Sequence, residues 1–156
     1  MDPRFPIDQL SPGGYQAMLA LEKYLHSCGL EQPLLHLLKL RASQINGCAY
    51  CIDMHWKDAR ALGESEQRLY GLDAWREAAY YTERERAALA WTEAVTLITQ
   101  GHASDAVYAE ASRHFSAKEL SDLTFVVSTI NAWNRLAIAA RSKAGQYVSH
   151  LGKKTS

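Results

Sequence analysis

Helical spacing of apolar residues runs through nearly the whole chain, and this pattern constrains the fold more than any other feature. Segments such as EQPLLHLLKLRASQI repeat apolar residues every three to four positions, and no stretch of useful length alternates them as a strand does. The connections between segments are short. The sequence therefore predicts an all-α protein, a helical bundle of antiparallel neighbours.

The chain of 156 residues is long enough to form one domain with a buried core and no disulfide bonds. No repeat, linker or low-complexity segment divides it. We expect an N-terminal arm over residues 1–10, a helical domain over residues 11–144 and a frayed C-terminal tail over residues 145–156.

Two helix starts are marked by a Ser or Thr followed three residues later by Glu. Thr82 with Glu85, and Ser116 with Glu119, have the spacing of capping boxes. A shorter helix is expected between them, over residues 105–114.

The charge pattern excludes several classes of partner. Seventeen Lys and Arg balance seventeen Asp and Glu, so the chain has no basic surface for nucleic acid or an anionic membrane. No apolar run approaches the roughly 18 residues of a membrane span, and the first ten residues do not resemble a secretory signal. We expect a cytoplasmic protein without nucleic-acid or membrane partners.

The segment NGCAYCIDMH, residues 46–55, holds two of the three cysteines of the chain. So few cysteines, in an odd number, argue against a secreted disulfide framework. If a helix begins near Cys48, then Cys48, Cys51 and His55 lie at i, i+3 and i+7 on one stripe of its surface. All three side chains can then meet in one small site.

This spacing suits thiol chemistry. Backbone N–H groups at a helix N-terminus favour an anion, so a thiol there ionises more readily than an ordinary cysteine. His55 can take or return a proton near neutral pH. Two thiols this close can also form a disulfide, in which one is oxidised and the other resolves it.

Other interpretations of the cysteine pair stay open. Two thiols on a helix can simply be buried. A structural zinc site needs four ligands, whereas the chain has no second C-x-x-C and His36, His102 and His114 are isolated in sequence. A haem attachment motif would need a histidine at Ile52.

Residues 40–63, LRASQINGCAYCIDMHWKDARALG, closely resemble the core of the alkyl hydroperoxidase D (AhpD) family of the carboxymuconolactone decarboxylase superfamily. Residues 130–139, INAWNRLAIA, resemble the second recurring segment of that family. The resemblance implies a small all-α subunit that assembles into homotrimers or homohexamers and reduces hydroperoxides with thiols.

The resemblance also assigns roles by position. It implies that Cys51 attacks the peroxide, Cys48 resolves the product and His55 belongs to a proton relay, with no bound cofactor or metal. An external dithiol must restore the pair, and in the best-understood case of the family this donor is a lipoyl group on a partner protein. Spacing and thiol chemistry support such a pair but do not decide which thiol attacks.

The sequence departs from the family at two positions. The family commonly has a glutamate twelve residues before the first cysteine, where this chain has His36. A neutral imidazole can also accept a proton, so His36 is a possible relay residue; alternatively, it is a polar-tipped residue on an apolar helix. The best-known peroxidase of the family has a histidine two residues after the first cysteine, where this chain has Tyr50.

Residues around the motif have structural interpretations beside functional ones. We expect Gln44 and Asn46 to finish a helix and form the turn before the cysteines. Trp133, Asn134 and Arg135 can line the pocket, form a subunit contact or pack within the chain.

The leading hypothesis is a thiol-dependent peroxidase. A redox sensor or scaffold without turnover, and a different thiol-disulfide oxidoreductase, are the alternatives. A lactone decarboxylase is disfavoured because such a lyase does not need the cysteine pair.

Overall fold

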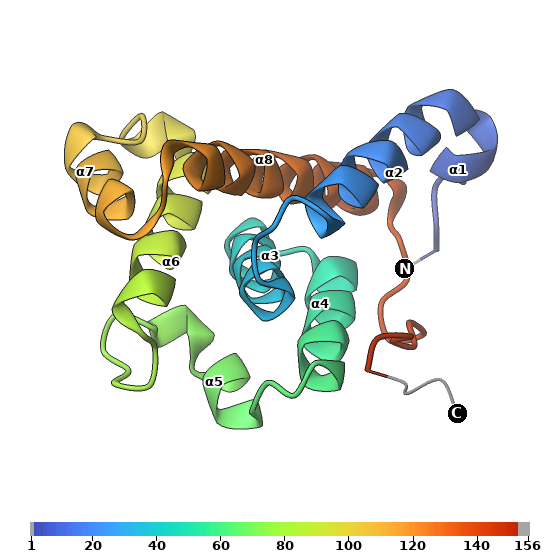
Figure 1. Ribbon diagram of the computed structural model, residues 1–156. Coiled ribbons are helices and arrows are strands. Elements are labelled where there is room, and N and C mark those ends of the chain that lie inside the picture. The colour runs from blue at the N-terminus through green and yellow to red at the C-terminus, as the bar shows by residue number, and fades with distance from the viewer. Residues whose placement is uncertain (1, 153–156) are drawn as a thin grey trace.

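The computed structural model describes residues 2–152, and within this range every regular element is a helix (Figure 1). The all-α prediction is confirmed. The elements are α1 (Ile7–Leu10), α2 (Pro12–His26), α3 (Gln32–Asn46), α4 (Ala49–Ala61), α5 (Glu66–Tyr70), η1 (Leu72–Ala74), α6 (Glu83–Thr96), η2 (Ile98–Gln100), α7 (Asp105–His114) and α8 (Ala117–Ala140).

Helix α3 forms the centre of the bundle. It packs against α4, α6 and α8, and Figure 1 shows it between α4 and α6 with α8 lying across one side. A helix surrounded in this way must be apolar on most of its circumference. Its buried leucines are Leu34, Leu35, Leu37, Leu38 and Leu40.

Both predicted capping boxes are present. The Thr82 hydroxyl accepts a hydrogen bond from the Glu85 N–H at the start of α6, and Ser116 accepts from Glu119 at the start of α8. In both boxes the glutamate side chain returns to the backbone of the capping residue, so two otherwise unpaired N–H groups are satisfied.

A tight turn joins α3 to α4. Gly47 ends α3 in the left-handed region, with φ 69°, where a residue with a side chain would be strained. The Cys48 N–H then donates back to the Ser43 carbonyl over 3.0 Å. The chain reverses within two residues, so α4 begins at Ala49 with Cys48 as its N-cap.

The C-terminal tail differs from the prediction of a frayed end. Over residues 145–152 it folds back onto α4, where Lys57 Nζ donates to the Tyr147 carbonyl over 2.9 Å. Chain ends are usually poorly ordered, but this tail is held in place because its polar groups pair with charged side chains of α4. Residues 153–156 of the expected tail lie outside the described range.

In residues 2–152 no helix has both the length and the apolar character that crossing a membrane requires.

Candidate functional site

The two cysteines of the motif lie together at the start of α4. Cys48 is the N-cap, Cys51 lies in the first turn, and each is 1% exposed and reduced. The Cys51 S–H donates a hydrogen bond to the Cys48 sulfur, and the backbone N–H groups of Cys51 and Tyr50 also face that sulfur. We call Cys48 and Cys51 the thiol end of the site.

These contacts separate the two thiols electrostatically. The hydrogen bond from Cys51, helped by the two backbone N–H groups, outweighs burial and lowers the pKa of Cys48 to about 7. The pKa of Cys51 is raised, first because its proton is held by Cys48 and second because it is buried. The first negative charge of the pair therefore resides on Cys48.

Helix α8 supports the thiol end through asparagines. Asn134 Nδ2 donates to Ser43 Oγ over 3.0 Å, and Asn46 Nδ2 donates to Asn134 Oδ1 over 2.8 Å and to Asn131 Oδ1 over 2.9 Å. The Asn134 side chain also hydrogen-bonds to both thiols, which lowers their pKa. Asn46 is the last residue of α3, as expected, and its side chain in addition links the turn to α8, while Asn134 is a direct neighbour of the cysteines.

Two histidines meet further along α4. His55 Nδ1 lies 3.4 Å from Nδ1 of His36, which α3 contributes, and both side chains are buried. Burial, followed by the charge of nearby Lys39, lowers the pKa of His36 to about 4 and lowers the pKa of His55 well below its ordinary value. Both imidazoles are therefore neutral at pH 7. The structure brings the possible relay residue His36 to His55.

Asp58 completes this group and was not among the residues expected from the sequence. Its Oδ2 lies 3.9 Å from His36 Nδ1, while its Oδ1 accepts hydrogen bonds from Tyr147 Oη (2.8 Å) and Ser149 Oγ (2.6 Å). The spacing of Asp58, three residues after His55 on the same helical face, is a signal that could have found it. We call His36, His55 and Asp58 the histidine end of the site.

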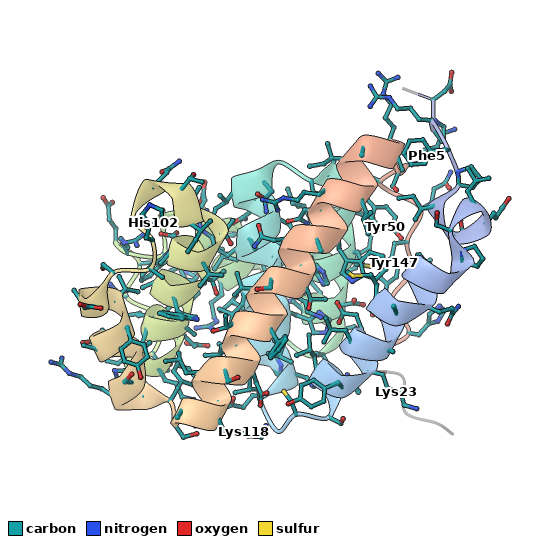
Figure 2. All side chains as sticks on the ribbon, turned by 90° about the horizontal axis from the view of Figure 1, so that it is seen from above. Phe5, Lys23, Tyr50, His102, Lys118 and Tyr147 are labelled. Carbon is teal, nitrogen blue, oxygen red and sulfur yellow. The ribbon has the colours of Figure 1, made fainter. Side chains whose placement is uncertain are left out.

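Both ends of the site line one cavity of about 480 Å³ between α2, α3, α4, α8 and the tail. Cys51 is among the lining residues, whereas Cys48 is not. Figure 2 shows Tyr50 and Tyr147 close together between α2 and α8, where they border the same cavity. Its other apolar and aromatic walls include Tyr15, Leu19, Leu35, Met54, Trp133 and Ala137.

A part-buried ion pair forms another part of the cavity wall, one helical turn from His36. Lys39 Nζ lies 2.6 Å from Glu22 Oε2, and Trp133 Nε1 donates to Glu22 Oε1 over 3.1 Å. Trp133 therefore lines the cavity, as one of the interpretations of its position expected. The sequence pattern did not reveal Glu22 or Lys39, because they come from different helices and meet only in the fold.

Two other residues of the recurring segments do not line the cavity. Arg41 Nε donates to Glu93 over 2.8 Å, and Arg135 Nη1 donates to the Asn131 carbonyl over 2.8 Å. The third cysteine, Cys28, is half-buried against the core. These residues stabilise helix packing rather than the site.

Comparison with known proteins agrees with this geometry. The sequence pattern of the carboxymuconolactone decarboxylase family matches residues 12–94. The chain is 40% identical to the Bacillus subtilis protein YdfG over 144 residues, which is 92% of this chain and 98% of YdfG.

Solved structures give the same fold. A protein of unknown function from Agrobacterium tumefaciens, suggested to be the antioxidant defence protein AhpD, is 44% identical, with a TM-score of 0.90 over 94% of this chain and all of that one. The debrominase Bmp8 shares the fold at 19% identity, with a TM-score of 0.77 over 88% of this chain and 74% of its own. From its sequence match and its AhpD-like fold, the chain belongs to the carboxymuconolactone decarboxylase family.

Proposed function

We propose that this protein is a thiol-dependent peroxidase that reduces organic hydroperoxides with Cys48 and Cys51. The observation that carries the proposal is the hydrogen-bonded thiol pair at the N-terminus of α4, in which Cys51 lines the cavity and Cys48 does not. A pair in which one thiol has a pKa near neutrality supplies a thiolate that can react with an electrophilic oxygen.

In the proposed reaction Cys51 passes its proton to the Cys48 thiolate and then attacks the terminal oxygen of the hydroperoxide. An S–O bond forms, the O–O bond breaks, and the departing alkoxide takes the proton from Cys48 to become an alcohol. The Cys48 thiolate attacks the sulfenic acid on Cys51, and the hydroxide that leaves is protonated to water. His55 carries this proton from solvent. Two thiols and one hydroperoxide thus give a disulfide, an alcohol and water.

The cavity supports an organic substrate. Aromatic and aliphatic side chains form most of its wall near the cysteines, and such a surface favours an alkyl or aryl group over hydrogen peroxide alone. The disulfide needs an external dithiol to reduce it by exchange. We propose a dithiol donor protein, with a lipoyl group as the reductant, and no bound cofactor.

Self-association remains a prediction of the family resemblance. Phe125 and Ile138 of α8 are 50% and 46% exposed, and apolar side chains at this exposure are suited to a contact between copies. We therefore retain the homotrimer or homohexamer as the proposed assembly.

The test is consumption of cumene hydroperoxide with lipoamide, dihydrolipoamide dehydrogenase and NADH as the recycling system. Turnover is expected in the native chain and in Cys28→Ser, the matched control, and is expected to be lost in Cys51→Ser and Cys48→Ser. In Cys48→Ser, one equivalent of peroxide is expected to leave a sulfenic acid on Cys51, detected by mass spectrometry after trapping with dimedone.

Two other results would change the proposal. A sulfenic acid found on Cys48 in Cys51→Ser, with none on Cys51 in Cys48→Ser, would exchange the roles of the thiols. A native protein that forms and loses its disulfide reversibly, yet consumes no peroxide, would favour a redox sensor or a different thiol-disulfide oxidoreductase.

A further inference from the structure

We propose that His36, His55 and Asp58 form a binding site for a divalent transition-metal ion of the zinc class. The proposal goes beyond the peroxidase function, and its test does not depend on it. This site is separate from a cysteine-based zinc site, because its ligands are two imidazole nitrogens and one carboxylate oxygen. All three residues are buried, and one ligand atom from each lies within 4.8 Å of the other two.

The distances between these atoms match metal ligation better than direct hydrogen bonding. The two Nδ1 atoms face each other at 3.4 Å, and His36 Nδ1 lies 3.9 Å from Asp58 Oδ2. Both separations exceed the 2.7–3.2 Å of an ordinary N–H···O or N–H···N hydrogen bond. Two ligands of a tetrahedral ion with zinc–nitrogen bonds near 2.0 Å are about 3.3 Å apart. The histidine pair has this spacing, whereas the carboxylate oxygen, 3.9 Å from His36 Nδ1 and within 4.8 Å of the other ligand atom, needs to move by up to about 1.5 Å.

The carboxylate is oriented for ligation by groups outside the cluster. Its Oδ1 accepts two hydrogen bonds, from Tyr147 and Ser149 of the tail, so that Oδ2 faces His36. Outer hydrogen bonds of this kind fix ligands in metal sites and contribute to affinity. Tyr147 and Ser149 of the tail therefore fix the orientation of Asp58, as outer hydrogen-bond partners fix a metal ligand.

The charged residues around the cluster and its access from the cavity also favour the binding of a cation. Lys39 is the positive charge that acts most strongly on both histidines, but it is paired with Glu22 at 2.6 Å. Because Lys39 is paired with Glu22, the Asp58 carboxylate is the one acidic group within the cluster of His36, His55 and Asp58 itself. The cavity that His36, His55 and Asp58 line gives an ion a path to the site and leaves a fourth position for water. An ion held there occupies His55, so it would block proton transfer to the thiols.

The test is zinc binding to untagged protein, measured by competition with a chelating dye. A Cys28→Ser/Cys48→Ser/Cys51→Ser background removes every thiol, so any remaining site must use other ligands. In this background we expect one zinc ion per chain. His36→Ala and Asp58→Asn are expected to lower the affinity by more than about tenfold, the loss that removing even an outer-shell partner produces. His114→Ala, outside the cluster, is the matched control and should bind as before.

Cobalt substitution identifies the ligand type independently. The thiol-free chain is expected to give cobalt ligand-field bands without a sulfur-to-metal charge-transfer band, and Asp58→Asn, which keeps the side-chain shape, should lose them. Circular dichroism verifies that each variant is folded. A thiol-free chain that binds no metal, or metal binding unaffected by both His36→Ala and Asp58→Asn, would overturn the proposal. Neither measurement requires turnover, so failure of the peroxidase proposal gives a separate result.

Discussion

The thiol end and the histidine end lie at two places along α4, the second with His36 added from α3, and they hold a thiolate at the first and neutral imidazoles at the second. At the start of α4, backbone N–H groups and the Cys51 S–H stabilise a thiolate on Cys48. Further along the helix, burial and the charge of Lys39 keep His36 and His55 neutral. One helix can therefore stabilise a thiolate at its N-terminus and, further along its buried face, keep imidazole groups neutral.

The two ends are also supported by different parts of the chain. Asn134 of α8 donates a hydrogen bond to Ser43 beside the thiol end, whereas Tyr147 of the tail donates one to Asp58 at the histidine end. If the supports are independent, a substitution at one end should leave the other unchanged.

The largest effect is expected from Asn134→Ala, which removes the support of the thiol end. The change deletes the hydrogen bonds to Ser43 and Asn46 in a fully buried position, so it should lower the free energy of unfolding by about 2–3 kcal/mol. Urea unfolding measures this loss, with exposed Arg113→Ala as a control expected to stay within about 1 kcal/mol. A loss as small as that of the control would mean that Asn134 does not support this end.

The next effect concerns the charge of the thiol pair. Ultraviolet absorbance of the thiolate, in a Cys28→Ser background, should rise with pH and reach half of one equivalent near pH 7, because the pKa of Cys48 is lowered. Cys51→Ala removes the S–H donor and should move the midpoint upward toward the ordinary pKa of about 8.5, which reduces the thiolate at pH 7 by roughly tenfold or more.

Cys51→Ser is the matched control for this titration, because its hydroxyl can still donate a hydrogen bond to Cys48. Its midpoint should therefore stay below that of Cys51→Ala. Equal midpoints in the two variants would mean that the helix N-terminus alone lowers the pKa of Cys48.

The same contrast explains how much of the site could be predicted from sequence. The thiol end depends on i, i+3 spacing after a turn at Gly47, so both cysteines and the start of α4 could be expected from the local pattern. The histidine end needs the packing of α3 against α4, which places His36 beside His55 across 19 positions of sequence.

The contacts of the C-terminal tail with α4 could not be predicted from the sequence for a related reason. Tyr147 reaches Asp58 from 89 positions away, through a polar contact that leaves no periodic pattern in the sequence. Helix starts and the fold class follow from local rules such as the capping boxes, and they were confirmed. Long-range polar contacts follow no such rule, so Lys39 and Glu22 emerged only from the structure, whereas the spacing of Asp58 from His55 was a local signal.

The smallest effect is expected from Tyr147→Phe, which removes one hydrogen bond from Asp58 and keeps the aromatic ring. Zinc affinity should fall by about tenfold, the low end of the effect of outer-shell partners, because Asp58 loses half of its support from the tail. Chelator competition measures this change, with exposed Tyr70→Phe as the control. The Cys48 titration should stay at its native midpoint, because Tyr147 supports only the histidine end. A shift of that midpoint in Tyr147→Phe would show that α4 couples the two ends, and their supports would then act as one.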